Sequence, residues 1–155
     1  MDKPTSFLFQ NIGLLADGEL QLVLEEKHTA VPERGFTPDY AFEIVTVTPP
    51  QKIGGIRLRF GTDETVFFHG HVGYDIDPPF RGHHYAERAC RLLLPVARAH
   101  GLSHLMLTCD PANEASRRTL ERLGARLLGV FDIPPQHDMR VRGRYRVLRY
   151  WWDIR

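Results

Sequence analysis

The sequence predicts a single α+β (or α/β) domain over residues 1–155, with helices flanking a mixed, mostly antiparallel sheet of six to seven strands. Three observations favour this fold class. The length suits one compact domain. The first half of the chain alternates apolar and polar residues between short turns, which is typical of antiparallel strands. The second half repeats apolar residues at helical spacing between strand-like runs, which predicts helices packed on the sheet.

The first half of the chain is predicted to be a meander of strands. Asp17-Gly18 is a turn signal between two short apolar runs, which predicts a hairpin. Residues 28–40 contain two prolines and a glycine without periodicity, which predicts a loop. Because the connections that follow are short, the next strands are expected to be antiparallel. Three of them are expected at 40–48, 52–61 and 65–76, and proline pairs end the first and the third.

The second half of the chain switches to helical periodicity. Apolar residues recur every three or four positions from Ala86 to Ala97, which predicts a helix that ends at Gly101. Pro95 lies inside this segment and should kink its axis. The remaining elements are expected in this order: a buried strand at 103–110, a helix at 110–125 capped by Asp110 or Asn113, and strands at 126–133 and 144–154.

Composition and charge exclude several classes of function. The formal net charge is +1, so neither nucleic acid nor an anionic membrane is expected as a partner. No run of about 18 apolar residues is present, and the N-terminus lacks the apolar core of a signal peptide. Cys90 and Cys109 belong to no Cys-x-x-Cys motif and are expected to be reduced, buried thiols. We therefore expect a cytoplasmic protein.

The segment between the third strand and the first helix is typical of an anion-binding site. It reads Arg81-Gly82-His83-His84-Tyr85-Ala86. The helix that follows presents unpaired backbone N–H groups and the positive end of its dipole. Gly82 lets a ligand approach the main chain closely, and Arg81 adds a positive charge. These features suit a phosphate or a pyrophosphate.

Pro78 and Pro79 predict a gap beside this anion site. Neither proline can donate a backbone hydrogen bond, so the strand before them must stop pairing there. If the strand at 103–110 lies parallel beside it, the two strands splay apart and leave backbone groups near Tyr74 and Ile76 free. An extended ligand with amide groups can dock there as an additional strand. Coenzyme A carries both a pyrophosphate and such an arm.

These motifs make the chain similar to the GNAT superfamily of acyl-CoA-dependent N-acyltransferases. The family signature Gln/Arg-x-x-Gly-x-Gly/Ala matches the segment from Arg81 to Ala86. A second family pattern matches Asn113, Ser116 and Gly124 on the later helix. The order of elements agrees with the family from about residue 40 to the C-terminus.

The resemblance implies a splayed parallel strand pair and acetyl-CoA as the cosubstrate. It implies direct transfer of the acetyl group, within a ternary complex, to a primary amine of a small molecule or a peptide, and it allows a homodimer. A non-catalytic acyl-CoA-binding module is the alternative from another class. The residues expected to bind the cofactor are Tyr74, Ile76, Arg81, Gly82, His83, His84, Tyr85, Ala86, Asn113 and Ser116.

Three features depart from the family pattern. His84 stands where the signature has its middle glycine, and a helical conformation at this position would tolerate the side chain. Leu120 stands where many members carry a tyrosine that protonates the departing thiolate. Because a thiol with a pKa of about 8.5 leaves as a thiolate with little assistance, the loss of this acid is tolerable. The loop at 28–40 is expected to replace the helices that usually wall the acceptor site.

Amide formation requires a neutral amine, so a base or a water relay is expected. His71 is the first candidate, because an imidazole with a pKa of about 6.5 is mostly neutral at pH 7. Asp75 is the second, because it lies closer to the expected thioester. Strand alternation would place both on one face. A structural histidine hydrogen-bonded across the sheet is the alternative for His71. The resemblance implies that a backbone N–H near Tyr74 stabilises the oxyanion.

Two further patterns in the sequence are not assigned to the binding of a ligand. His69-x-His71 has a chelating spacing, but no third ligand completes it in the sequence, so no metal site is expected. Arginines alternate along the C-terminal run, which is typical of the solvated face of a hairpin. They stand at Arg140, Arg142, Arg144, Arg146 and Arg149.

Overall fold

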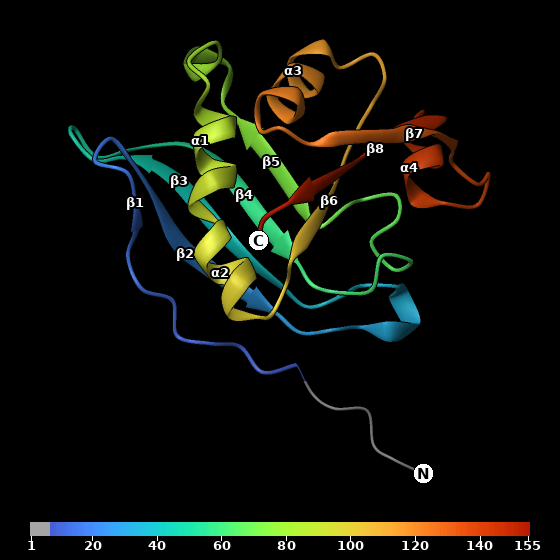
Figure 1. The fold of residues 1–155 in the computed structure, drawn as a ribbon, viewed down its shortest axis with the longest axis horizontal. Coiled ribbons are helices and arrows are strands. Elements are labelled where there is room, and N and C mark those ends of the chain that lie inside the picture. The colour runs from blue at the N-terminus through green and yellow to red at the C-terminus, as the bar shows by residue number, and fades with distance from the viewer. Residues whose placement is uncertain (1–6) are drawn as a thin grey trace.

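The computed structural model describes residues 7–155 as a mixed α+β fold, so the predicted fold class is confirmed (Figure 1). Within these residues, eight strands form two antiparallel sheets, with the orders β1-β2-β3-β4-β5 and β6-β8-β7. The strands are β1 (Leu15–Ala16), β2 (Leu20–His28), β3 (Asp39–Thr46), β4 (Gln51–Arg59), β5 (Val72–Ile76), β6 (His104–Cys109), β7 (Arg126–Asp132) and β8 (Arg146–Asp153). The helices are α1 (Tyr85–Leu92), α2 (Leu94–Ala99), α3 (Glu114–Arg122) and α4 (Asp138–Val141), and 3₁₀ turns span Pro32–Arg34 and Pro78–Phe80.

The five-stranded sheet is the meander that the sequence predicts. Its first turn forms because the Asp17 carboxylate accepts the backbone N–H groups of Glu19 and Leu20, while Gly18 adopts a left-handed φ of 93°. Between β2 and β3 the chain forms a loop with a single 3₁₀ turn, as expected. Helices α1 and α2 lie across one face of this sheet (Figure 1), and α1 contacts β2 and β5. The main core lies between these layers.

The start of β5 lies beside the middle of β6, and the two strands then diverge (Figure 1). The backbone N–H of His71 donates to the carbonyl of Met106 at 2.8 Å. Across residues 7–155, no other backbone hydrogen bond joins the two strands, because β5 pairs with β4 and β6 pairs with β8. The predicted splayed pair is therefore present. Because β5 and β6 diverge, the strands form two sheets instead of the predicted single sheet of six to seven strands.

The third predicted strand is shorter than its sequence pattern indicates. Residues 63–69 form turns, His71 is a bend, and only β5 itself is extended. The carbonyl of Thr62 accepts the N–H of Val66, and Gly70 adopts a left-handed φ of 73°. These turns interrupt the period-two pattern, so the prediction that His69 shares a strand face with the residues of β5 is wrong.

The first predicted helix consists of two helices. α1 ends at Leu92 and α2 begins at Leu94. Pro95 lies in the first turn of α2, where the missing N–H costs no helical hydrogen bond. The structure therefore has a break between two helices where the sequence analysis expected a kink within one helix. No helix in the described part of the chain has the length and the apolar composition needed to cross a bilayer.

The C-terminal arginine run is not a simple solvated face. Part of it forms the short helix α4, which the sequence analysis did not predict. Arg149 is only 7% exposed, and its guanidinium lies 3.5 Å from the centroid of the Phe67 ring. Its Nε also donates to the Phe67 carbonyl at 3.1 Å. The turns before β5 cover β8, the central strand of its sheet. Because of this tertiary contact Arg149 is buried, although the alternating arginine pattern predicted a solvated position.

Candidate functional site

A cleft of about 510 Å³ opens between β5, the beginning of α1 and α3. It brings together most of the residues that the sequence analysis singled out. These are Tyr74, Asp75, Ile76, Arg81, Gly82, His84, Tyr85, Ala86, Asn113 and Ser116. Five further residues complete the lining: Phe80, Ala115, Arg118, Thr119 and Arg122. His71 and His83 do not line it.

The backbone of Tyr74 faces the gap between β5 and β6. The N–H of Asp77 donates to the carbonyl of Ile53, and the N–H of Arg59 donates to the carbonyl of His71. The odd-numbered residues of β5 therefore direct their backbone groups toward β4. In an antiparallel ladder the intervening residues point the opposite way. The N–H and C=O of Tyr74 are therefore directed away from β4, as the sequence analysis expects.

Arg81 occupies the end of β5. Its Nε donates to the carbonyl of Ile76 at 2.7 Å, and its Nη2 lies 3.5 Å from the carboxylate of Asp75. The Ile76 carbonyl is therefore occupied, which contradicts the prediction that it is free. The side chain of Arg81 is 60% exposed, so the guanidinium remains accessible to an anion in the cleft.

The turn before α1 contains two left-handed residues. Gly82 has a φ of 90°, and a Cβ added to it would meet nothing within 4 Å, which suits a close approach by a ligand. His84 is the N-cap of α1 and has φ 62° and ψ 23°. The condition under which the sequence analysis found a side chain tolerable here, a helical conformation, is therefore not met. A left-handed residue with a Cβ costs roughly 1–2 kcal/mol, so a glycine would fit this position without strain.

Asn113 and Ser116 form the α3 side of the cleft. The Asn113 side chain accepts the N–H of Ser116 at 3.1 Å, which confirms the predicted helix cap. The Ser116 hydroxyl lies 2.8 Å from the hydroxyl of Tyr74, so this pair joins α3 to β5. Burial raises the pKa of Tyr74 to about 12, although the hydrogen bond to Ser116 opposes the shift. The phenol is therefore protonated at neutral pH.

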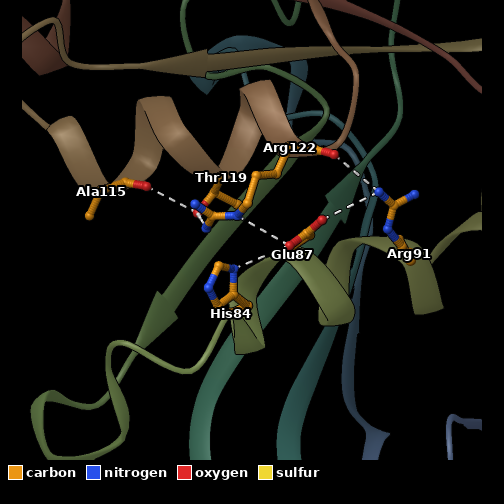
Figure 2. Close-up of polar contacts among 6 residues, drawn as sticks. All are labelled: His84, Glu87, Arg91, Ala115, Thr119 and Arg122. Atoms are coloured by element: carbon orange, nitrogen blue, oxygen red, sulfur yellow. Dashed lines mark hydrogen bonds and ion pairs between the residues drawn. The ribbon is translucent and has the colours of Figure 1, made fainter.

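Glu87 joins α1 to α3. Figure 2 shows its carboxylate between His84, Arg91 and Arg122. One carboxylate oxygen lies 3.2 Å from Nε of Arg122, and the other lies 3.4 Å from Nη2 of Arg91. Burial raises the pKa of Glu87, but the hydrogen bonds from both arginines outweigh it and the net shift is downward. The nearest nitrogen of His84 lies 3.5 Å away, so this ring is directed toward α1.

Arg118 and Arg122 line the cleft from α3, and the sequence analysis missed both. They recur with Ala115 and Thr119 at i, i+3, i+4 and i+7, which places all four on one helix face. This spacing was the available signal, but a stripe that mixes small and charged residues is typical of an ordinary surface. Together with Arg81, the two arginines give the lining three guanidinium groups. Their carboxylate partners are Asp75, Glu114 and Glu87, but the side chains of Arg81 and Arg118 are 60% and 66% exposed, so both can also contact a ligand in the cleft. The cleft therefore suits an anionic ligand.

His71 is a buried residue at the start of β5. It is 1% exposed, and its Nδ1 accepts the N–H of Met106 at 2.8 Å. Burial lowers its pKa to about 4, so the ring is neutral and one lone pair is already used. These contacts agree with the structural alternative for His71. Leu120 is also buried, at 1% exposure, and does not line the cleft.

The chain belongs to the GNAT acetyltransferase family. The model of the GNAT acetyltransferase domain matches residues 17–126, which include every residue that lines the cleft. The resemblance noted in the sequence is thereby confirmed. A search among curated proteins finds no match.

Solved acetyltransferase structures share the fold. A GNAT-family acetyltransferase from Bacillus anthracis superimposes with a TM-score of 0.56 at 22% identity, over 72% of this chain and 63% of that chain. The microcin C7 self-immunity acetyltransferase MccE, in complex with acetyl-CoA and AMP, gives 0.57 at 17% identity over 74% and 61%. RimL, a ribosomal L7/L12 α-N-protein acetyltransferase in complex with coenzyme A, gives 0.65 at 13% identity over 91% and 98%. The chain spans less than two thirds of the first two structures but nearly all of the third.

Proposed function

We propose that this protein is an N-acetyltransferase that moves the acetyl group of acetyl-CoA to a primary amine by direct attack in a ternary complex. The observation that carries the proposal is the cleft beside the diverging strand β5. It combines outward-facing strand backbone, a left-handed turn at a helix start and three arginines. Membership of the GNAT family supports the reaction class. Two structures with this fold contain acetyl-CoA or coenzyme A, which supports the choice of cosubstrate.

The two ends of the cosubstrate have different partners in this proposal. The pyrophosphate lies at the turn 82–86, where the first N–H groups of α1 are free of helical partners. Arg81 and the two arginines on α3 supply the balancing charge. The amide-bearing arm runs along β5 and exchanges hydrogen bonds with the backbone of Tyr74, in the manner of an added strand.

The chemical step requires a proton acceptor and an oxyanion donor. The amine nitrogen attacks the thioester carbonyl, the C–S bond breaks, and coenzyme A departs as a thiolate while the ammonium loses a proton. The N–H of Tyr74 is the oxyanion donor in this proposal. Asp75 is the carboxylate of the lining and is 78% exposed, so we assign it the proton, received through solvent water. His71 is not assigned this role because its Nδ1 is occupied.

The hydroxyl of Tyr74 does not replace the acid that is missing at Leu120. Its pKa of about 12 exceeds the thiol pKa of about 8.5 by roughly 3.5 units. At 1.36 kcal/mol per unit, transfer of the phenol proton to the thiolate costs about 5 kcal/mol. The phenol can therefore donate a hydrogen bond to the sulfur, but the proton that restores the thiol comes from solvent or from the ammonium.

The acceptor is a primary amine of a small molecule or a peptide. RimL matches this chain over almost its full length and is an α-N-protein acetyltransferase, which favours a free peptide N-terminus as the first acceptor to test.

Two measurements test the proposal. Calorimetric titration with acetyl-CoA should show saturable binding to one site, and thiol release should then appear with at least one member of an amine panel. The acceptor should gain about 42 daltons, because acetyl replaces hydrogen. Absence of acetyl-CoA binding would overturn the proposal. Binding without thiol release across small amines and free peptide N-termini would instead indicate the acyl-CoA-binding module.

A further inference from the structure

We propose that His69, His137 and Asp138 form a Zn²⁺ site outside the cleft. One ligand atom from each residue lies within 4.8 Å of the other two. His69 belongs to the turns that precede β5, and the other two residues lie at the start of α4 (Figure 1). The fold thus places two further ligands, His137 and Asp138, beside His69, while His71 is buried and does not belong to the cluster.

The distances within this cluster are close to those that a tetrahedral ion requires. Oδ1 of Asp138 lies 3.4 Å from Nε2 of His69 and 2.9 Å from Nδ1 of His137. Zinc bonds of about 2.0–2.2 Å at tetrahedral angles place neighbouring ligand atoms about 3.3 Å apart. The side chain of His69 is 41% exposed, so it can rotate to close the remaining separation between the two rings.

The hydrogen bonds around His137 leave a conflict that a cation removes. The N–H of Met139 donates to Nδ1 at 3.1 Å, which requires a lone pair on that nitrogen. The carboxylate of Asp138 is also an acceptor and lies 2.9 Å from the same atom. An unprotonated Nδ1 therefore repels the carboxylate, and a protonated one cannot accept from Met139. A divalent ion bound to Nδ1 and to the carboxylate neutralises this repulsion, and it occupies the lone pair of Nδ1 in place of the Met139 N–H.

The ligand types indicate zinc. Two imidazole nitrogens with one carboxylate oxygen suit Zn²⁺, and three protein ligands leave one position for water. Calcium and magnesium prefer sites composed of oxygen atoms, so this set favours neither. A bound ion would connect the turns before β5 to the segment between β7 and β8. Because an ion that binds the folded chain stabilises it, the melting temperature should rise with zinc concentration.

Metal uptake by the full-length chain tests this proposal directly. After treatment with a chelator and buffer exchange, calorimetry should show one equivalent of Zn²⁺, and Co²⁺ should give the visible absorption of a tetrahedral site. His69→Gln and Asp138→Asn should each weaken Zn²⁺ binding at least about tenfold. His28→Gln is the matched control, because His28 also contacts two carboxylates, those of Glu26 and Asp39, and should leave Zn²⁺ binding unchanged.

Two results would overturn the zinc site. One is the absence of a saturable equivalent of Zn²⁺, and the other is an equal loss of binding in His28→Gln, which would indicate general uptake by surface histidines. A circular dichroism spectrum of each variant confirms that it is folded. Because the readout is metal uptake and none of the three residues lines the cleft, failure here leaves acetyl transfer unaffected.

Discussion

Single side chains set the charge of the cleft, and Arg81 is fixed by its neighbours at the end of β5. Its hydrogen bond to Ile76 holds the guanidinium beside the turn at which we place the pyrophosphate. Arg81→Glu should weaken coenzyme A binding about tenfold, a loss of about 1.4 kcal/mol, because an attraction becomes a repulsion. Calorimetry measures the affinity, and Arg34→Glu in the distant loop is the control. Equal affinity in wild type and Arg81→Glu would contradict this placement of the pyrophosphate.

The buried position of His71 leads to a prediction about stability and not about catalysis. Burial lowers its pKa from 6.5 to about 4 in the folded protein. Between these values the unfolded chain binds more protons, so the free energy of unfolding falls as the pH decreases from 6.5 toward 4. The shift corresponds to a loss of up to about 3 kcal/mol. Urea denaturation at several pH values between 7.5 and 4 measures it.

The matched variants separate His71 from the other histidines. His71→Gln should be less stable at pH 7.5, because the replacement fits the buried site poorly, and should lose much of the pH dependence below pH 6.5. His83→Gln alters a histidine outside the core and should retain the wild-type dependence. An unchanged pH dependence in His71→Gln would show that other groups are responsible for the acid sensitivity.

At the scale of elements, Glu87 holds α1 against α3 (Figure 2). Glu87→Gln should lower the free energy of unfolding by about 1 kcal/mol or less at pH 7, because the two arginines are partly exposed. The pKa of this carboxyl is lowered by its partners, so its contribution is present above pH 4.5 and is lost as the pH falls further. Chemical denaturation at pH 7 and at acidic pH measures both effects.

The control for Glu87 is an ion pair within one helix. Glu114 and Arg118 lie 2.7 Å apart on α3, and both side chains are about two thirds exposed. Glu114→Gln should therefore change stability less than Glu87→Gln. If the two variants behave alike, the contact between α1 and α3 contributes nothing beyond a surface pair.

Local chemistry explains which elements were predictable. The Asn113 cap, the Asp17-Gly18 turn and the stop at Pro78-Pro79 depend on neighbours in the sequence, and the structure confirms each of them. The motif at 81–86 was identified for the same reason. The sequence therefore located the cleft through the ends of its strand and its helices.

The errors arose where distant contacts decide the structure. Residues 65–71 alternate as a strand would, but most of them fold into turns that pack on β8 through Arg149. His84 follows the spacing of a helix start, yet its left-handed φ is visible only in three dimensions. Arg118 and Arg122 were missed because the position of α3 opposite α1 depends on the separation of β5 from β6.

At the scale of the whole molecule, the cleft exists because a single backbone hydrogen bond joins β5 to β6 within the described residues. The N–H of His71 meets the carbonyl of Met106, and beyond this contact β5 and β6 separate. Gly70 stands directly before the junction with a left-handed φ of 73°. A Cβ at Gly70 would lie 2.9 Å from the Met106 carbonyl oxygen and 3.3 Å from the N of Thr108. The junction therefore requires a residue without a side chain.

Gly70→Ala consequently tests whether this junction sets the width of the cleft. The control is Gly101→Ala, since Gly101 has a φ of 82° and nothing within 4 Å of its added Cβ. Gly101→Ala should cost only the left-handed strain, about 1–2 kcal/mol in the free energy of unfolding. Gly70→Ala should cost about 1–3 kcal/mol more, because its Cβ pushes β6 away from β5. That displacement moves α3 relative to α1, so coenzyme A affinity should fall in Gly70→Ala and not in Gly101→Ala. Equal stability and equal affinity in the two variants would show that the cleft is held open by α1 and α3 instead of by the junction.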